Sequence, residues 1–291
     1  LTGAHAAVVN PDAAAAYAER HALHALLVQR GGEIVFERYA GGYDAAKPHA
    51  LYSGTKSFWG VLAVAAQHDG LLDVDEPVSR TLPEWSAGDK ARVRLRDLLQ
   101  LTSGIGFGGL GSAVPSFDKA AATELKDEPR ATFTYGGIPL QVFGAVLARK
   151  LAPRGLSPNA YLHERILDSI GLCIGSWRTL EDGTLPLPTG AFVTAREWCK
   201  FGQLVRDGGT WEKKTIVPRA SLAHCFASSD ANPRYGLGWW LSPLPEHPDV
   251  VYASGAGGQA MYVVPSADAV VVKFGGSASH KHDAFLKRLL G

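Results

Sequence analysis

A serine and a lysine three positions apart stand at the head of an apolar, helix-forming segment. The tetrapeptide is Ser53-Gly54-Thr55-Lys56, and the apolar run Ser57–Ala66 follows it. Residues three apart lie one turn from each other on one face of a helix. A serine at the start of that helix also lies near the positive end of the helix dipole. This arrangement suits Ser53 as a nucleophile and Lys56 as the base that activates it.

A hydrolase built on this pair needs a second proton carrier and an oxyanion hole. Tyr135, in the sequence FTYGG before a predicted helix, is the candidate proton carrier. Near a lysine ammonium the pKa of its hydroxyl would be lowered, and it could pass protons to and from Ser53. The oxyanion hole could use the backbone N–H of Ser53 and one from the glycine-rich segment Ser254–Gly258.

Strand patterns lie at both ends of the chain, and helical patterns fill the middle. Strands are predicted over 24–30, 33–39, 236–241, 250–254, 259–264 and 269–274, with a hairpin turn at Gly31-Gly32. Helices are predicted over 13–20, 53–70, 94–101, 138–151, 158–170, 194–207, 218–226 and 282–290. This order predicts an α/β (α+β) fold. Residues 1–50 and 230–291 would form an antiparallel sheet domain and 51–229 a mostly helical domain, with the catalytic site between them.

The composition is that of an ordinary globular protein. The chain has 291 residues, a hydrophobic content of 46%, a charged content of 20% and a net charge of +1. No basic stripe interleaved with aromatic residues occurs, so nucleic acid is not an expected partner. No apolar run reaches the roughly 18 residues that a transmembrane helix needs.

The three cysteines, Cys173, Cys199 and Cys225, form no C-x-x-C pair. We expect mostly buried free thiols, with one disulfide as the alternative in an exported protein. The chain begins at Leu1, and its only methionine is Met261. Either a leader has been removed or the sequence has been trimmed, so a bacterial protein of the periplasm, the medium or the cytoplasm is compatible with it. The oligomeric state is left open.

Six segments, in order along the chain, resemble the serine β-lactamase-like family. This group includes class C β-lactamases, DD-peptidases, β-lactamase-type carboxylesterases and 6-aminohexanoate-dimer hydrolases. The segments are LYSGTKS (51–57), GLLDVDEPV (70–78), DLLQLTSGI (97–105), FTYGG (133–137), YGLGWW (235–240) and ASGAGGQ (253–259). They are similar to the family's S-x-x-K element, its G-x-L-x-L-D-x-P-V and L-L-x-H-T-S-G-L segments, its Y-x-N element, its Y-G-L-G-W-W strand and its K-T-G or H-T-G strand.

The resemblance implies a β-lactamase/transpeptidase-like fold and a two-step acyl transfer. Ser53 would form the acyl ester and Lys56 would activate it, while Tyr135 would relay protons to the leaving group and from water. The N–H groups of Ser53 and Ala256 would form the oxyanion hole. No metal or organic cofactor is implied.

Two positions depart from the family pattern. Gly137 stands where the family has the Asn of Y-x-N, and Ala253 stands where it has Lys or His. Each loss removes a polar anchor worth about 1–3 kcal/mol to a penicillin-type ligand. A small ester or amide is therefore the favoured substrate and a β-lactam a poor one. Substrate contacts are expected at Gly137, Ser254, Gly255, Gly257 and Phe107, and the loops 102–115 and 179–189 are expected to shape the pocket.

Two other functions stay open on the same fold. A non-catalytic binding or sensor domain, or one that is acylated without turnover, is the alternative that Gly137 and Ala253 motivate. A DD-peptidase acting on peptidoglycan is the other, and the loss of the carboxylate-binding residue at Ala253 speaks against it.

Simpler explanations exist for several of these residues. Ser53 alone could be a helix N-cap, and Tyr135 could be an ordinary core tyrosine. The G-x-G-x-x-G pattern at 106–111 lies in a loop after a helix, which argues against dinucleotide binding. The pairs His21/His24 and His280/His282 have no carboxylate or cysteine at metal-ligand spacing, so structural or solvent-exposed roles are expected for them.

Overall fold

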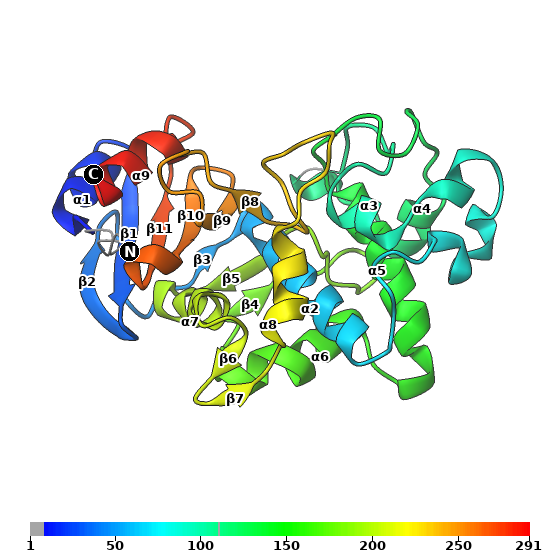
Figure 1. Cartoon of the computed structure of the whole chain (residues 1–291), viewed down its shortest axis with the longest axis horizontal. Coiled ribbons are helices and arrows are strands. Elements are labelled where there is room, and N and C mark those ends of the chain that lie inside the picture. Colours follow the sequence, from blue (N-terminus) through cyan, green and yellow to red (C-terminus); the bar gives the residue numbers. More distant parts are fainter. Residues whose placement is uncertain (1–8, 110) are drawn as a thin grey trace, which may run out of the picture.

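The computed structural model describes residues 9–109 and 111–291. Its main sheet has the strand order β2-β1-β11-β10-β9-β8, and every neighbouring pair in it is antiparallel. Figure 1 shows this sheet on one side and most of the helices on the other. The strands are β1 (Leu23–Arg30), β2 (Glu33–Tyr39), β8 (Trp240–Leu241), β9 (Val251–Gly255), β10 (Gln259–Val264) and β11 (Ala269–Gly275). An antiparallel sheet made from both chain ends is therefore confirmed.

Alternation of side chains along the strands creates a core on each face of the sheet. In β11, Val270, Val272 and Phe274 pack into the larger core, whereas Val271 packs into the smaller one. The smaller core lies under α1 (Pro11–Glu19) and α9 (His282–Leu290), which also pack against each other. The larger core lies under α7 (Ala195–Arg206) and continues into the helical part of the chain.

The middle of the chain is built around α2 (Lys56–His68) and α5 (Ile138–Leu151), two apolar helices that are buried along most of their length. The other helices of this part are α3 (Leu95–Leu99), α4 (Phe117–Ala121), α6 (Pro158–Leu162) and α8 (Arg219–Ala223). Short strands accompany them: β3 (His49–Ala50), β4 (Ser176–Trp177), β5 (Ala191–Val193), β6 (Thr210–Trp211) and β7 (Lys214–Thr215). The predicted helix over 138–151 has the same bounds in the structure.

Helix α7 lies within the range 51–229, yet it packs against β1, β10 and β11. It packs there because its buried face covers the inner side of the sheet. This face includes Trp198, Phe201 and Val205. The division at residues 50 and 230 thus cuts between α7 and the sheet that it covers. The division into two domains remains a prediction from the sequence.

The strand predicted over 236–241 is present only as Trp240–Leu241. The preceding residues do not join the sheet because their backbone bonds elsewhere. The N–H of Leu237 donates to the carbonyl of Cys225, and the N–H of Gly238 donates to the carbonyl of Leu99. The three cysteines are free, with Cys199 and Cys225 buried and Cys173 exposed. None of the described helices is long and apolar enough to cross a membrane.

Candidate active site

Ser53 lies in a short 3-10 turn, Tyr52–Thr55, that leads directly into α2. The chain turns sharply before it, because Tyr52 adopts a left-handed backbone with φ of 48°. The N–H of Leu51 donates to the carbonyl of Ala191, which fixes the start of this turn. Lys56 is the first residue of α2, and helical side chains lean toward the N-terminus. Its amine therefore lies beside Ser53.

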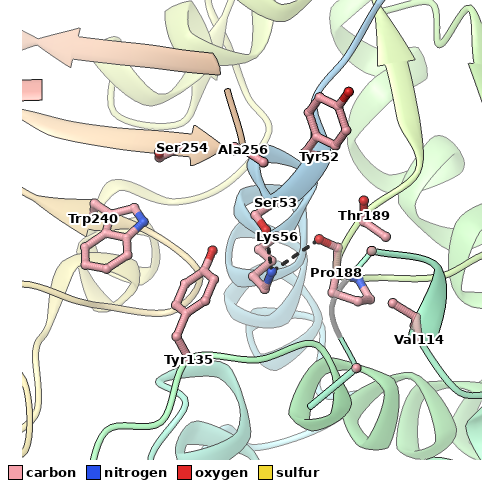
Figure 2. A pocket seen from close by; sticks show the side chains of 13 residues that line it. Tyr52, Ser53, Lys56, Val114, Tyr135, Pro188, Thr189, Trp240, Ser254 and Ala256 are labelled. Carbon is pink, nitrogen blue, oxygen red and sulfur yellow. Dashed lines mark hydrogen bonds between the residues drawn. The ribbon is translucent and has the colours of Figure 1, made fainter. Parts of the chain in front are cut away.

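The Lys56 amine is fully buried and hydrogen-bonded to the Ser53 hydroxyl. Its Nζ lies 3.0 Å from Ser53 Oγ and 3.4 Å from the carbonyl oxygen of Pro188 (Figure 2). Lys56 forms no ion pair within the described chain, and burial lowers its pKa to about 7. A large fraction of this amine is therefore neutral near pH 7, and a neutral amine can accept a proton.

Tyr135 stands just before α5 and faces the same amine. Lys56 Nζ lies 4.8 Å from the centre of its ring, and the ring stacks on Trp240 with centroids 5.8 Å apart. Burial raises the pKa of Tyr135, and its hydrogen bond with the Ser53 side chain opposes this shift only in part. The expected lowering of the pKa is therefore wrong. Because its pKa is raised, Tyr135 stays protonated near neutral pH.

The end of β9 approaches the turn that carries Ser53 very closely. A Cβ on Gly255 would lie 2.0 Å from the carbonyl oxygen of Leu51, so only glycine fits at this position. This contact brings Ala256 beside Ser53, as Figure 2 shows. The backbone N–H groups of Ser53 and Ala256 donate to no other backbone group in the described residues. Both N–H groups are thus available to a bound oxyanion.

A cavity of about 400 Å³ lies over these groups. A small acyl compound would fit, because ligand pockets typically measure about 300–1,000 Å³. The cavity brings together Ser53, Lys56, Tyr135, Ser254, Gly255 and Ala256 of the predicted site. Lys56 and the tyrosines are the ionisable side chains in its described lining.

Several lining residues were not among the predicted site residues. These are Tyr52, Gly109, Gly111, Val114, Pro188, Thr189 and Trp240. The loops 102–115 and 179–189, which were expected to shape the pocket, contain five of the seven. The sequence therefore indicated the right loops but not the individual residues. Tyr52 and Trp240 had a signal too, because they stand inside segments that resemble family motifs.

Three predicted substrate contacts lie outside the described lining of the cavity: Gly137, Gly257 and Phe107. Gly137 is buried against the carbonyl of Gly109, where a Cβ would come within 2.0 Å of the oxygen. Gly257 follows Ala256 in the connection from β9 to β10, and Phe107 is 76% exposed. Ala253 is buried in the larger core.

Comparison with known proteins agrees with this fold and geometry. Residues 14–286 match the family model described as Beta-lactamase. The chain belongs to the Beta-lactamase family. This match covers most of the chain, as the ordered motifs indicated. The β-lactamase/transpeptidase-like fold is confirmed, and the protein is a β-lactamase-fold hydrolase.

Proteins with several different names are similar to this chain. The 6-aminohexanoate-dimer hydrolase of Paenarthrobacter ureafaciens is 22% identical over 86% of this chain and 71% of its own length. A solved structure from Bacillus anthracis carries the same name provisionally. It has a TM-score of 0.79 at 20% identity, and the match covers 94% of this chain and 79% of that one. The D-stereospecific amidohydrolase of a Streptomyces species has a TM-score of 0.75 at 18% identity, and the match covers 96% of this chain and 98% of that one.

Proposed function

We propose that this protein is a serine hydrolase that cleaves a small, uncharged ester or amide through an acyl ester on Ser53. The observation that carries the proposal is the buried Lys56 amine, 3.0 Å from Ser53 Oγ with its pKa lowered to about 7. A neutral amine at hydrogen-bond distance is what a general base for a serine requires. The 6-aminohexanoate-dimer hydrolase and amidohydrolase names of its relatives support amide or ester chemistry.

In the first step, Ser53 Oγ bonds to the substrate's carbonyl carbon and its proton passes to Lys56 Nζ. The N–H groups of Ser53 and Ala256 stabilise the oxyanion. The tetrahedral intermediate then breaks its bond to the leaving alcohol or amine, which receives a proton through the Tyr135 hydroxyl. In the second step, water adds to the Ser53 ester and its proton returns through the same groups. Release of the carboxylic acid restores Ser53.

The lining of the cavity supports an uncharged substrate. Val114, Pro188 and Trp240 offer apolar surface, and no arginine, aspartate or glutamate is among the described lining residues. A carboxylate bound here would lose its hydration without gaining a fixed counter-ion. This supports neutral acyl groups over penicillin-type ligands, in keeping with Gly137 and Ala253 at the two altered family positions.

A chromogenic short-chain ester, p-nitrophenyl butyrate, tests the proposal. We expect the parent protein to release nitrophenol and Ser53→Ala to be slower by about 10³-fold or more, because the nucleophile is gone. Ser57→Ala is the matched control, since the Ser57 hydroxyl donates to the carbonyl of Gly54 and does not line the cavity. Equal rates for the parent and Ser53→Ala would contradict the mechanism.

A further inference from the structure

A chain of hydrogen bonds runs from the cavity wall into the smaller core, between residues that are far apart in the sequence. Ser254 Oγ on β9 lies 2.9 Å from Nε2 of His282, the first residue of α9. Nδ1 of that ring lies 2.7 Å from the hydroxyl of Tyr262 on β10. The same hydroxyl lies 3.1 Å from Nε2 of His280. Ser254 lines the cavity, whereas Tyr262 is fully buried.

The two imidazoles in this hydrogen-bond network, those of His280 and His282, are both neutral. Burial, and to a smaller extent the positive charge of Lys273, lowers the pKa of His282 to about 4. The same two causes, in the same order, hold the pKa of His280 well below its usual range. The Tyr262 hydroxyl is protonated, because burial raises its pKa well above the usual value. Each ring therefore has one N–H donor and one acceptor nitrogen, and Tyr262 has one proton to donate.

Two directions of donation satisfy all three hydrogen bonds and also give the buried Tyr262 proton an acceptor. In one, His280 Nε2 donates to Tyr262, Tyr262 donates to His282 Nδ1, and His282 Nε2 donates to Ser254. The Ser254 proton is then free to point into the cavity. In the other direction every bond is reversed, and the Ser254 hydroxyl donates its proton to His282 Nε2. The cavity would then meet only the lone pairs of the Ser254 oxygen.

The unpartnered nitrogen of His280 decides between these directions. Its Nδ1 is buried and has no hydrogen-bond partner among the described residues. In the first direction this atom is a bare acceptor, but in the reversed direction it carries an N–H with nowhere to donate. Orphaned buried N–H groups are rarer than under-used acceptors. The first direction is therefore favoured, with Nε2–H on both rings.

We propose that His282, held by Tyr262 and His280, is a positioning residue that makes Ser254 a one-way hydrogen-bond donor to the substrate. This inference rests on the proposed hydrolase function and narrows its substrate class. The favoured acyl groups are uncharged and place an acceptor atom, such as an ether or carbonyl oxygen, against the β9 wall. Acyl groups with a donor at that position are disfavoured, because two donors would face each other.

Two esters of matched shape test the selection. In p-nitrophenyl methoxyacetate an ether oxygen replaces one methylene of p-nitrophenyl butyrate. We expect His282→Leu to lower the ratio of kcat/KM for methoxyacetate over butyrate by about tenfold, mainly through the KM for methoxyacetate. Ser254 then loses the partner that directs its proton into the cavity, so its hydrogen bond to the ether oxygen is weakened. His282→Gln can still donate from its amide and should recover most of the ratio. The double variant His282→Leu/Ser254→Ala should lower the ratio no further than Ser254→Ala alone. An unchanged ratio in His282→Leu would overturn the proposal.

A spectroscopic measurement on the unaltered protein tests the direction itself. Nitrogen-15 NMR of the histidine rings, assigned with His280→Gln and His282→Gln, should show Nε2–H and a bare Nδ1 on both rings. Nδ1–H on His282 would overturn the one-way donor even if the kinetic ratio changes. This readout does not depend on ester turnover. A protein that hydrolyses neither ester would contradict the proposed function, while the ring tautomers would still test this inference.

Discussion

The proposed reaction depends most on Lys56. Sequence spacing brought Ser53 and Lys56 together, because residues three apart share a helical face whatever surrounds them. The spacing contained no information about the surroundings that set their pKa values. Burial lowers the pKa of the Lys56 amine and raises that of the Tyr135 hydroxyl. These shifts support the proposal that the lysine is the base and that the tyrosine is a protonated relay.

The pH dependence of hydrolysis follows from the amine. Lys56 must be neutral to accept the Ser53 proton, so kcat/KM for a non-ionising ester should rise with pH through about 7 and level off above it. Below that pH each unit should cost about tenfold, because protonated amine replaces neutral amine in that proportion. The measurement is a kcat/KM profile for p-nitrophenyl butyrate between pH 5.5 and 8.5, corrected for spontaneous hydrolysis. A flat or falling profile would exclude Lys56 as the base.

At the scale of elements, the site depends on how the connection between β9 and β10 is held beside Ser53. Gln259 is buried, and its amide nitrogen donates to the carbonyls of Ala256 and Gly275, at 2.8 Å and 2.6 Å. Its amide oxygen accepts from the N–H of Gly275 at 2.8 Å. This one side chain joins the connection between β9 and β10 to the end of β11. We infer that it keeps the Ala256 N–H in place during catalysis.

Replacing Gln259 by leucine should therefore reduce turnover more than stability. We expect Gln259→Leu to lower kcat for p-nitrophenyl butyrate by about tenfold or more, while KM changes little, because oxyanion stabilisation acts on the transition state. Gln29→Leu is the matched control: Gln29 is also buried, but it bonds to Gln203 on the inner face of the sheet. Both variants should lose about 1–3 kcal/mol of stability. Equal kcat values for the two variants would show that Gln259 only stabilises the fold.

Prediction of elements from the sequence succeeded where local patterns decide them. The hairpin at Gly31-Gly32 and the long helix over 138–151 needed only turn chemistry and apolar spacing. The prediction of a strand over 236–241 was wrong for its first residues, because their backbone N–H groups donate to Cys225 and Leu99. These partners are distant in the sequence, so the local pattern contains no information about them. The contact between Ser254 and His282 was missed for the same reason, since it depends on α9 packing against the sheet.

At the scale of the whole molecule, the cavity is assembled by segments from the middle of the sequence and from its C-terminal part. The turn before α2 supplies Ser53, the approach to α5 supplies Tyr135, and the end of β9 supplies Ala256. The ordered motifs predicted this convergence through their resemblance to a known family. They did not predict the uncharged character of the lining, which arises from loop residues such as Val114 and Pro188.

This uncharged lining should make the protein discriminate by charge. The mono-p-nitrophenyl ester of succinate and p-nitrophenyl 4-methylpentanoate have similar shapes, but the first carries a carboxylate. At pH 8.5, where Lys56 is mostly neutral, we expect kcat/KM to be at least about tenfold lower for the succinate ester, because no fixed cation offsets its desolvation. A preference for the anionic ester would show that a counter-ion acts at the site and would contradict the proposed substrate class.

Covalent labelling with a fluorophosphonate tests the central claim most directly, because it identifies the nucleophile and its dependence on the base in one measurement. The protein is incubated with the reagent at pH 8, and the adduct is located by mass spectrometry of its peptides. We predict one phosphonyl group on Ser53, and labelling that is slower by about 100-fold or more in Lys56→Met. A label on any other residue, or equal labelling rates in Lys56→Met and the parent, would contradict the account.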